Sequence, residues 1–294
     1  EFRRVLFRSC TDLTMTNDKF ATLFGSSARQ LEGPLTQREM DLAASVQAVT
    51  EEVVIKLAKG IRKSTGQKNL CLAGGVALNC VANGKLLRGD VFDNIWVQPA
   101  SGDAGGAIGA ALAAYHLMLD KPRTVNPGDA MNGSYLGPDY AQHDIEERLK
   151  AIGAVYTVVS EDNLIAETAR ALAEGKAVGW HQGRMEFGPR ALGGRSIIAD
   201  PRSPLVQKQL NLKVKYRESF RPFAPSVLRE HVSEWFDLDS DSPYMLLVAP
   251  VAKKHTRELT AEEKKKFGRE KLLTLRSTIP AVTHVDYSAR VQTV

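Results

Sequence analysis

The chain has 294 residues, a hydrophobic content of 43% and a formal net charge of +5. These values are typical of one large or two ordinary globular domains, and they exclude a chain that is disordered throughout. The three cysteines are odd in number and lack CxxC spacing, so neither a disulfide framework nor a zinc ribbon is predicted. We therefore expect a soluble, cytoplasmic protein.

Residues 1–9, EFRRVLFRS, match the translation of a common sequencing adapter, so we predict that they are an artefact. They carry a net charge of +2, which leaves +3 for the remaining chain. We expect the natural polypeptide to continue upstream of Cys10. The most apolar stretch, residues 104–119, is shorter than the ~20 residues that cross a bilayer, so no membrane segment is expected.

Residues 10–125 are predicted to form a first α/β domain. Apolar residues at helical spacing indicate a long amphipathic helix over residues 37–62. The apolar run at residues 69–73 then meets a pair of glycines, and a helical pattern follows over residues 76–87. This order indicates a strand, a glycine turn and a helix.

A second strand is predicted at residues 94–97, followed by a small-residue helix over residues 104–118. Strands that alternate with helices in this way are expected to be covered by them. Asn, Gly and Pro are concentrated at residues 120–133, which indicates a connector between domains.

Residues 134–294 are predicted to form a second α/β domain. Helices are expected at residues 141–151 and 162–173, and buried strands at residues 155–159 and 177–180. The highly charged stretch at residues 253–271 is interpreted as a solvated surface segment without an assigned function.

Gly74 and Gly75 are a candidate nucleotide site. They lack Cβ atoms, and a helix N-terminus follows them, so a phosphate could approach the backbone. Neither GxGxxG nor the P-loop pattern is present, and an ordinary tight turn fits the spacing equally well. Asn79, one turn into the predicted helix, could contact a ribose or a base, or could be a solvated polar residue.

Asp103 precedes the small-residue helix and is a candidate metal ligand. Its carboxylate could instead cap the first turn of that helix, which the residue type alone favours. Glycines 105, 106 and 109 are unfavourable within a helix. We therefore expect a neighbouring helix or a ligand to approach that face closely.

Positive charge is concentrated at residues 181–230, where ten Lys and Arg face four Asp and Glu, a net charge of +6. Arg184, Arg190 and Arg195 lie beside glycines, and Arg221 lies among aromatics and prolines. A guanidinium group binds phosphate or carboxylate through two parallel hydrogen bonds. A structural salt-bridge network is the alternative, but the surplus of positive charge favours a small-anion site.

A nucleic acid is the other polyanion that this charge could bind. Its backbone would suit arginines along one helical stripe, whereas these arginines lie in glycine-bounded turns. Nucleic acid is therefore not the expected partner.

Three segments, LCLAGGVALNCVANGKLL at residues 70–87, MEFGPRALGGRSIIADPR at residues 185–202 and FRPFAPSVL at residues 220–228, strongly resemble the NodU/CmcH family of O-carbamoyltransferases. The final IPAVTHVDYSARVQTV also resembles this family, although Tyr287 stands where glycine is expected. The resemblance implies the C-terminal half of an actin-like ATPase-superfamily domain followed by a YrdC-like domain, truncated at its end.

The resemblance implies that carbamoyl phosphate and ATP form a carbamoyl-adenylate, whose carbamoyl group passes to a hydroxyl of a small-molecule acceptor. Arg190 and Arg221 would hold carbamoyl phosphate, with Arg184 and Arg195 beside them. Gly74, Gly75 and Asn79 would contact the adenylate. Mg would accompany ATP.

Asp103 would bind a divalent metal, with iron expected, whose histidine ligands lie outside this sequence. We therefore expect the chain alone to be inactive. Two alternatives remain: transfer of a threonylcarbamoyl group to tRNA, and a non-catalytic nucleotide-binding module.

Overall fold

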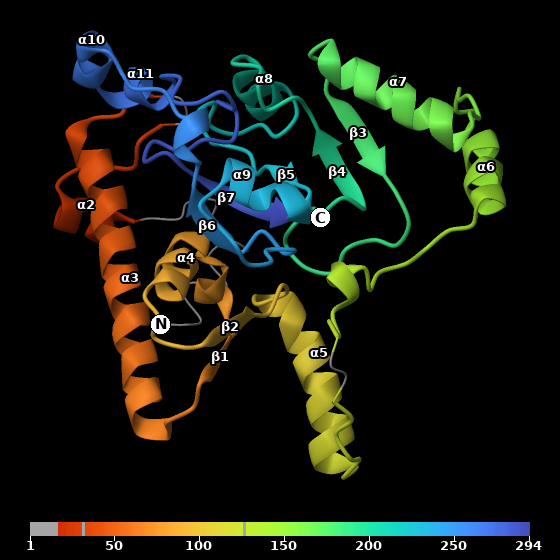
Figure 1. Ribbon diagram of the computed structural model, residues 1–294, viewed down its shortest axis with the longest axis horizontal. Coiled ribbons are helices and arrows are strands. Elements are labelled where there is room, and N and C mark those ends of the chain that lie inside the picture. The colour runs from red at the N-terminus through yellow and green to blue at the C-terminus, as the bar shows by residue number, and fades with distance from the viewer. Residues whose placement is uncertain (1–16, 31–32, 126–127) are drawn as a thin grey trace.

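The computed structural model describes residues 17–30, 33–125 and 128–294, so the predicted artefact at residues 1–9 lies outside the described residues. It has a mixed α/β fold (Figure 1). The helices are α2 Asp18–Phe24, α3 Gln37–Thr65, η1 Gly75–Leu78, α4 Cys80–Arg88, α5 Asp103–Ala113, η2 Ala114–Met118, η3 Asn132–Ser134, α6 Gln142–Ala151, α7 Glu161–Ala173, α8 Val206–Lys213, η4 Arg229–His231, α9 Val232–Trp235, η5 Lys253–His255, α10 Ala261–Lys265 and α11 Gly268–Leu272. The strands are β1 Asn69–Leu72, β2 Asn94–Val97, β3 Val178–His181, β4 Arg195–Ile198, β5 Ser226–Val227, β6 Leu247–Pro250 and β7 Ser288–Thr293.

The first part of the chain confirms the predicted long helix and both predicted strands. The carboxylate of Glu39 accepts a hydrogen bond from the Thr36 N–H at 2.9 Å, which closes the start of α3, and Gly66 ends the helix in the left-handed conformation. Strands β1 and β2 pair in parallel, and α3 and α5 lie on either side of them (Figure 1).

Two predicted helices differ from those in the structure. The pattern over residues 76–87 forms the 3₁₀ turn η1 and the separate helix α4, because Asn79 interrupts them with non-helical backbone angles. Asn79 is thus the N-cap of α4 and not a residue one turn inside a helix. Residues 104–118 form α5 followed by the π-helical turn η2.

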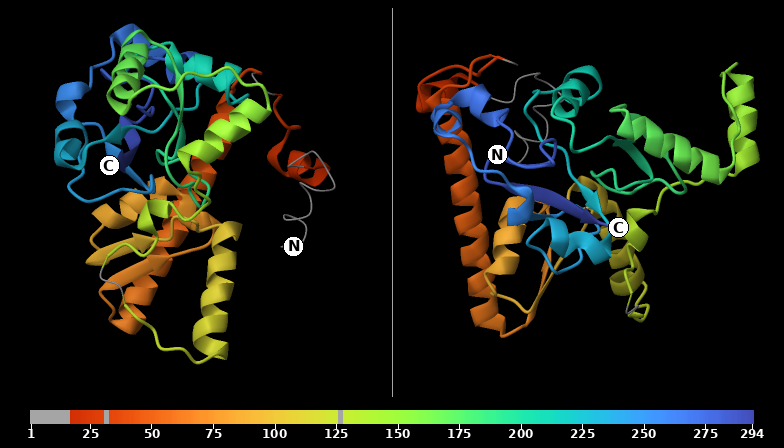
Figure 2. Two further views of the ribbon diagram at one scale, coloured as in Figure 1. Left: turned by 90° about the vertical axis from the view of Figure 1, so that its right-hand side faces the viewer. Right: turned by 45° about the horizontal axis from the view of Figure 1, so that its top comes forward.

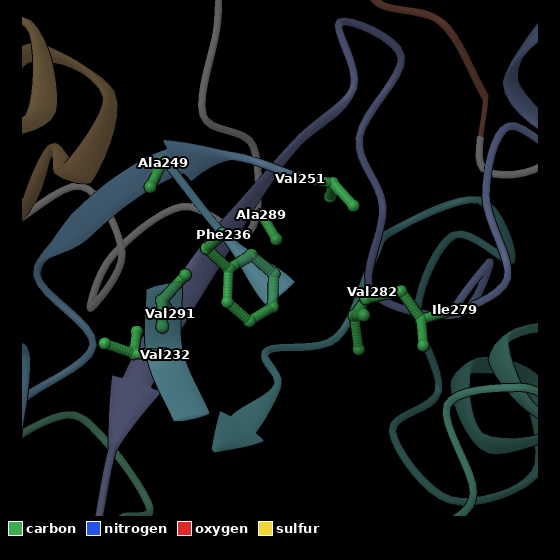
Figure 3. Packing of buried hydrophobic residues seen from close by; sticks show 8 residues of the cluster. All are labelled: Val232, Phe236, Ala249, Val251, Ile279, Val282, Ala289 and Val291. Carbon is green, nitrogen blue, oxygen red and sulfur yellow. The ribbon is translucent and has the colours of Figure 1, made fainter. Parts of the chain in front are cut away.

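The second part of the chain contains two separate sheets. Strands β3 and β4 pair antiparallel, and the other sheet has the order β5-β7-β6. Its core includes Phe236, whose ring lies among small side chains of β6 and β7 (Figure 3). Helix α6 lies at the outer edge of the molecule and α7 contacts β3, and neither helix has a buried residue (Figures 1 and 2).

The strand predicted at residues 155–159 was wrong, because this segment is irregular and Val155 is fully exposed. β-Branched residues form a strand only where an edge is available for pairing, and this segment has none. The strand predicted at residues 177–180 is confirmed as β3, although Gly179 and His181 are exposed and the strand is not buried.

A shared hydrophobic core joins the two predicted domains. Ala77 and Val97 of the first part pack with Met131 of the connector and with Leu192, Tyr244 and Leu246 of the second part. The buried amide of Asn83 strengthens this junction by donating to the carbonyl oxygens of Ala77 at 2.8 Å and Leu246 at 3.1 Å. The predicted connector therefore lies beside a continuous core.

The charged stretch at residues 253–271 forms short, mostly exposed helices, in agreement with its interpretation as a solvated segment. Among the helices within residues 17–30, 33–125 and 128–294, none combines the length and apolar character that a bilayer crossing needs.

Candidate functional site: a cationic cavity

A cavity of about 410 Å³ lies between β4, α8 and β7. Its apolar surface comes from side chains of a small core cluster, including Val206, Leu210 and Ala281. Its charged surface comes from four side chains: Arg190, Lys215, Arg217 and Arg290. No Asp or Glu is among the described residues that line it, so the cavity is strongly electropositive.

Two cations of the cavity, Arg190 and Arg290, lack full compensation. The Nε atoms of Arg190 and Arg290 are buried, and neither has a hydrogen-bond partner within the described part of the chain. Burial lowers the pKa of Arg290, and the nearby positive charge of Arg190 lowers it further. Unpaired charge in such a place is costly, so the arrangement favours the binding of an anion.

Arg217 is held in place by its surroundings. Its Nε donates to the Asn211 side-chain oxygen at 2.6 Å, and its guanidinium lies 5.0 Å from the centre of the Phe223 ring. Burial lowers the pKa of Arg217, and the charge of Arg221 acts in the same direction. Arg221 therefore lies close to Arg217, although it is exposed and does not line the cavity.

Arg195 and Arg184 have other partners. The Nε of Arg195 faces the Glu186 carboxylate at 3.4 Å, as expected for the structural salt bridge that was the alternative reading. The Nε of Arg184 donates to the Gly137 carbonyl at 3.1 Å, and its side chain is exposed. Of the four predicted arginines, the structure thus brings only Arg190 into the cavity wall.

The glycine turn has space around it. Gly74 has a φ of +97°, a conformation that favours glycine, and a Cβ added at Gly74 or Gly75 would meet no atom within 4 Å. The Asn79 side chain, by contrast, is engaged: its oxygen accepts from the Ala82 N–H at 3.1 Å, and its amide donates to Gln47 at 2.9 Å. The turn is open to a ligand, whereas the Asn79 side chain already caps α4 and binds Gln47.

Asp103 does not cap its helix. It is the first residue of α5, the N-cap is Gly102, and no side-chain capping bond forms. Its carboxylate is exposed, and the described residues contain no group of three or more His, Cys, Asp or Glu that could hold a metal ion. These residues do not fit a complete metal site. The close approach expected at the helix glycines occurs at Gly105 only, where an added Cβ would lie 2.1 Å from the Ala100 carbonyl oxygen.

Sequence reasoning missed Lys215, Arg217 and Arg290 as members of the site. The first two lie within the stretch of surplus positive charge, so the charge count already contained them. Arg290 lies on β7, a strand whose other residues are buried. A single cation within a buried strand is the signal that could have identified it.

Comparisons with known proteins identify the family of the chain. Residues 1–112 match the family described as Carbamoyltransferase N-terminus, and residues 169–294 match Carbamoyltransferase C-terminus. The chain therefore belongs to the carbamoyltransferase family.

Similar curated proteins include nodulation proteins and a protein described as uncharacterized. An uncharacterized protein of Synechocystis sp. is 60% identical, with 98% of this chain and 47% of that protein covered. Nodulation protein NolNO of Sinorhizobium fredii is 43% identical, covering 89% and 35%, and nodulation protein U of Bradyrhizobium diazoefficiens is 34% identical, covering 92% and 42%. The chain spans about half the length, or less, of these relatives.

Proposed function

We propose that this carbamoyltransferase activates carbamoyl phosphate with ATP and transfers the carbamoyl group, through a carbamoyl-adenylate, to a hydroxyl of a small-molecule acceptor. The observation that supports this most is the cavity lined by Arg190, Lys215, Arg217 and Arg290 without an acidic residue among its described lining. Two anionic substrates repel each other, and fixed guanidinium groups stabilise the charge that develops when they react.

Within this proposal, Arg190 binds the phosphate of carbamoyl phosphate inside the cavity. Arg221 lies outside the cavity wall but close to Arg217, and its positive charge adds to the attraction of the anion. Arg184 and Arg195 support the surrounding loop. Gly74 and Gly75 contact the adenylate, with Asn79 at the edge of that site. The corresponding domain assignment is an actin-like part before the connector and a YrdC-like part after it.

A divalent metal, such as iron, bound at Asp103 would polarise the carbamoyl carbonyl. Since the described residues offer no complete ligand set, we assign no step of the reaction to it. Mg would accompany the ATP phosphates. The hydroxylated acceptor is a sugar or an antibiotic-like molecule.

Turnover is best tested on a chain of the relatives' length, and the Synechocystis protein is suitable. Carbamoyl phosphate should stimulate its conversion of ATP to AMP. Alanine at the position that aligns with Arg190 should lower that rate by about 10²-fold or more, as expected for loss of a transition-state donor. If carbamoyl phosphate does not change the rate of AMP formation, the proposal is wrong. Tight ATP binding without turnover would instead support a non-catalytic module.

A further inference from the structure

The loop that carries Arg190 is closed by one carboxylate. The Oε1 atom of Glu186 accepts hydrogen bonds from the backbone N–H groups of Leu192 at 2.8 Å, Gly194 at 2.8 Å and Arg195 at 3.0 Å. The guanidinium of Arg195 also donates to the backbone carbonyl of Glu186 at 3.0 Å. The start and end of the loop are thus tied together, with Arg190 between them.

The Glu186 carboxylate that closes the loop is buried, and its surroundings favour the ionised form. The Glu186 side chain is only 3% exposed. Burial alone would raise its pKa, but the backbone donors outweigh burial and hold the pKa of Glu186 below the usual range. Gly194 permits the close approach, because a Cβ there would lie 2.9 Å from the Arg184 carbonyl oxygen and 3.1 Å from the Glu186 carboxyl carbon.

The closed end of the loop is also joined to the cavity wall. The carbonyl of Leu192 accepts from the Tyr135 hydroxyl at 2.9 Å and from the Gln292 side chain at 2.8 Å. Gln292 itself lines the cavity. Within the described residues Arg190 forms no ion pair with a carboxylate, its Nε has no hydrogen-bond partner, and its guanidinium donates one long bond of 3.5 Å to the Leu78 carbonyl. The position of Arg190 therefore depends mainly on the geometry of its loop.

We propose that Glu186 is a positioning residue: its buried carboxylate fixes the loop so that Arg190 reaches the anion bound in the cavity. This role rests on the anion-binding function proposed above. Glu186 does not line the cavity, so it has no contact with the bound anion and acts by holding the loop.

The test is a double-mutant cycle on the 294-residue chain, with inorganic phosphate as the probe and titration calorimetry as the measurement. Glu186→Gln keeps the size of the side chain but removes its charge. It should weaken phosphate binding about tenfold in the unmodified chain and less than about twofold in the Arg190→Ala background, because coupled residues are not additive. Unfolding curves of each variant establish that it is folded.

Glu263→Gln is a matched control. The Glu263 carboxylate likewise accepts a backbone N–H, that of Thr260 at 3.0 Å, and faces a guanidinium, that of Arg257, but it does not line the cavity. Phosphate affinity should not change in this variant. If Glu186→Gln does not fold, Glu186→Asp is used in its place. Aspartate keeps the negative charge but its side chain is one methylene shorter. It should therefore weaken phosphate binding in the unmodified chain and much less in the Arg190→Ala background.

Two results overturn the proposal, and they differ. If Glu186→Gln weakens phosphate binding equally with and without Arg190, Glu186 has a structural role only and the anion site stands. If the unmodified chain does not bind phosphate, the anion site and the role of Glu186 are both rejected.

Discussion

The guanidinium of Arg190 donates a hydrogen bond of 3.5 Å to the carbonyl oxygen of Leu78, the last residue of the short helix η1, which begins at Gly75. The side chain that lines the cationic cavity therefore also contacts the segment of the glycine turn. The two candidate sites, which are more than 100 residues apart in the sequence, are neighbours in the structure. This closeness suits a reaction that needs a phosphorylated substrate and a nucleotide together.

Phosphate should stabilise the chain, and Arg290 should be required for the effect. At a concentration of 100 Kd, a ligand that binds only the folded state adds about 2.7 kcal/mol to the free energy of unfolding. Arg290→Met should abolish most of this gain and leave the ligand-free chain equally or more stable, because it removes an incompletely compensated buried cation.

Thermal unfolding with and without phosphate measures both effects of Arg290→Met. Arg202→Met is the control, since Arg202 pairs with Asp200 and does not line the cavity. A full phosphate effect in Arg290→Met would contradict the assignment of this residue to the site.

Adjacent glycines of α5 should respond oppositely to alanine. Gly105→Ala would force a Cβ against the Ala100 carbonyl, so we expect a loss of about 1 to 3 kcal/mol, typical of overpacking. Gly106→Ala meets no atom within 4 Å and should gain about 0.5 to 1 kcal/mol from helix propensity. Denaturant unfolding of both variants measures the difference, and equal effects would show that Ala100 does not approach the helix closely.

Acid should destabilise the chain through His284. Burial lowers the pKa of this imidazole below its ordinary value of 6.5, and Arg290 acts in the same direction, against Asp286. The unfolded chain therefore takes up a proton near pH 6.5 while the folded chain does not. The stability that His284 contributes is complete above that pH and is lost as the pH falls from it towards the folded pKa.

Replacing the imidazole of His284 separates this effect from other acid effects. His284→Gln should flatten the fall in unfolding free energy just below pH 6.5. An unchanged pH profile in that variant would mean that other groups are responsible for it.

Substitutions of Asn79 can separate helix capping from nucleotide binding. Asn79→Ala should cost about 1 kcal/mol of stability by removing the N-cap of α4. Asn79→Ser keeps a capping oxygen and most of that stability but removes the amide. If Asn79 contacts the adenylate, the Ser variant should bind ATP more weakly; unchanged ATP affinity would exclude that contact.

Local sequence patterns predicted the features that depend on neighbouring residues. Helical spacing identified α3, and the short apolar runs identified β1 and β2. Arg190, which lines the cavity, was singled out because glycines and a proline surround it. The strand expected at residues 155–159 shows the limit of such reasoning, since β-propensity does not reveal whether a pairing edge exists.

The rest of the site depends on distant residues. Arg290 reaches the cavity only because β7 pairs with β5 and β6, and nothing near residue 290 in the sequence reports that pairing. The main partners of Glu186 are backbone N–H groups, which a count of charges does not include.

The core that joins Ala77 and Val97 to Leu192 and Leu246 should hold the molecule together after a protease cuts the connector between the two parts. The peptide bond after Arg123 lies in an exposed segment, so trypsin should reach it while both halves are still packed together. The two pieces should then elute as one particle and separate only in denaturant. New termini at this position should therefore be tolerated, which makes it a suitable site for circular permutation.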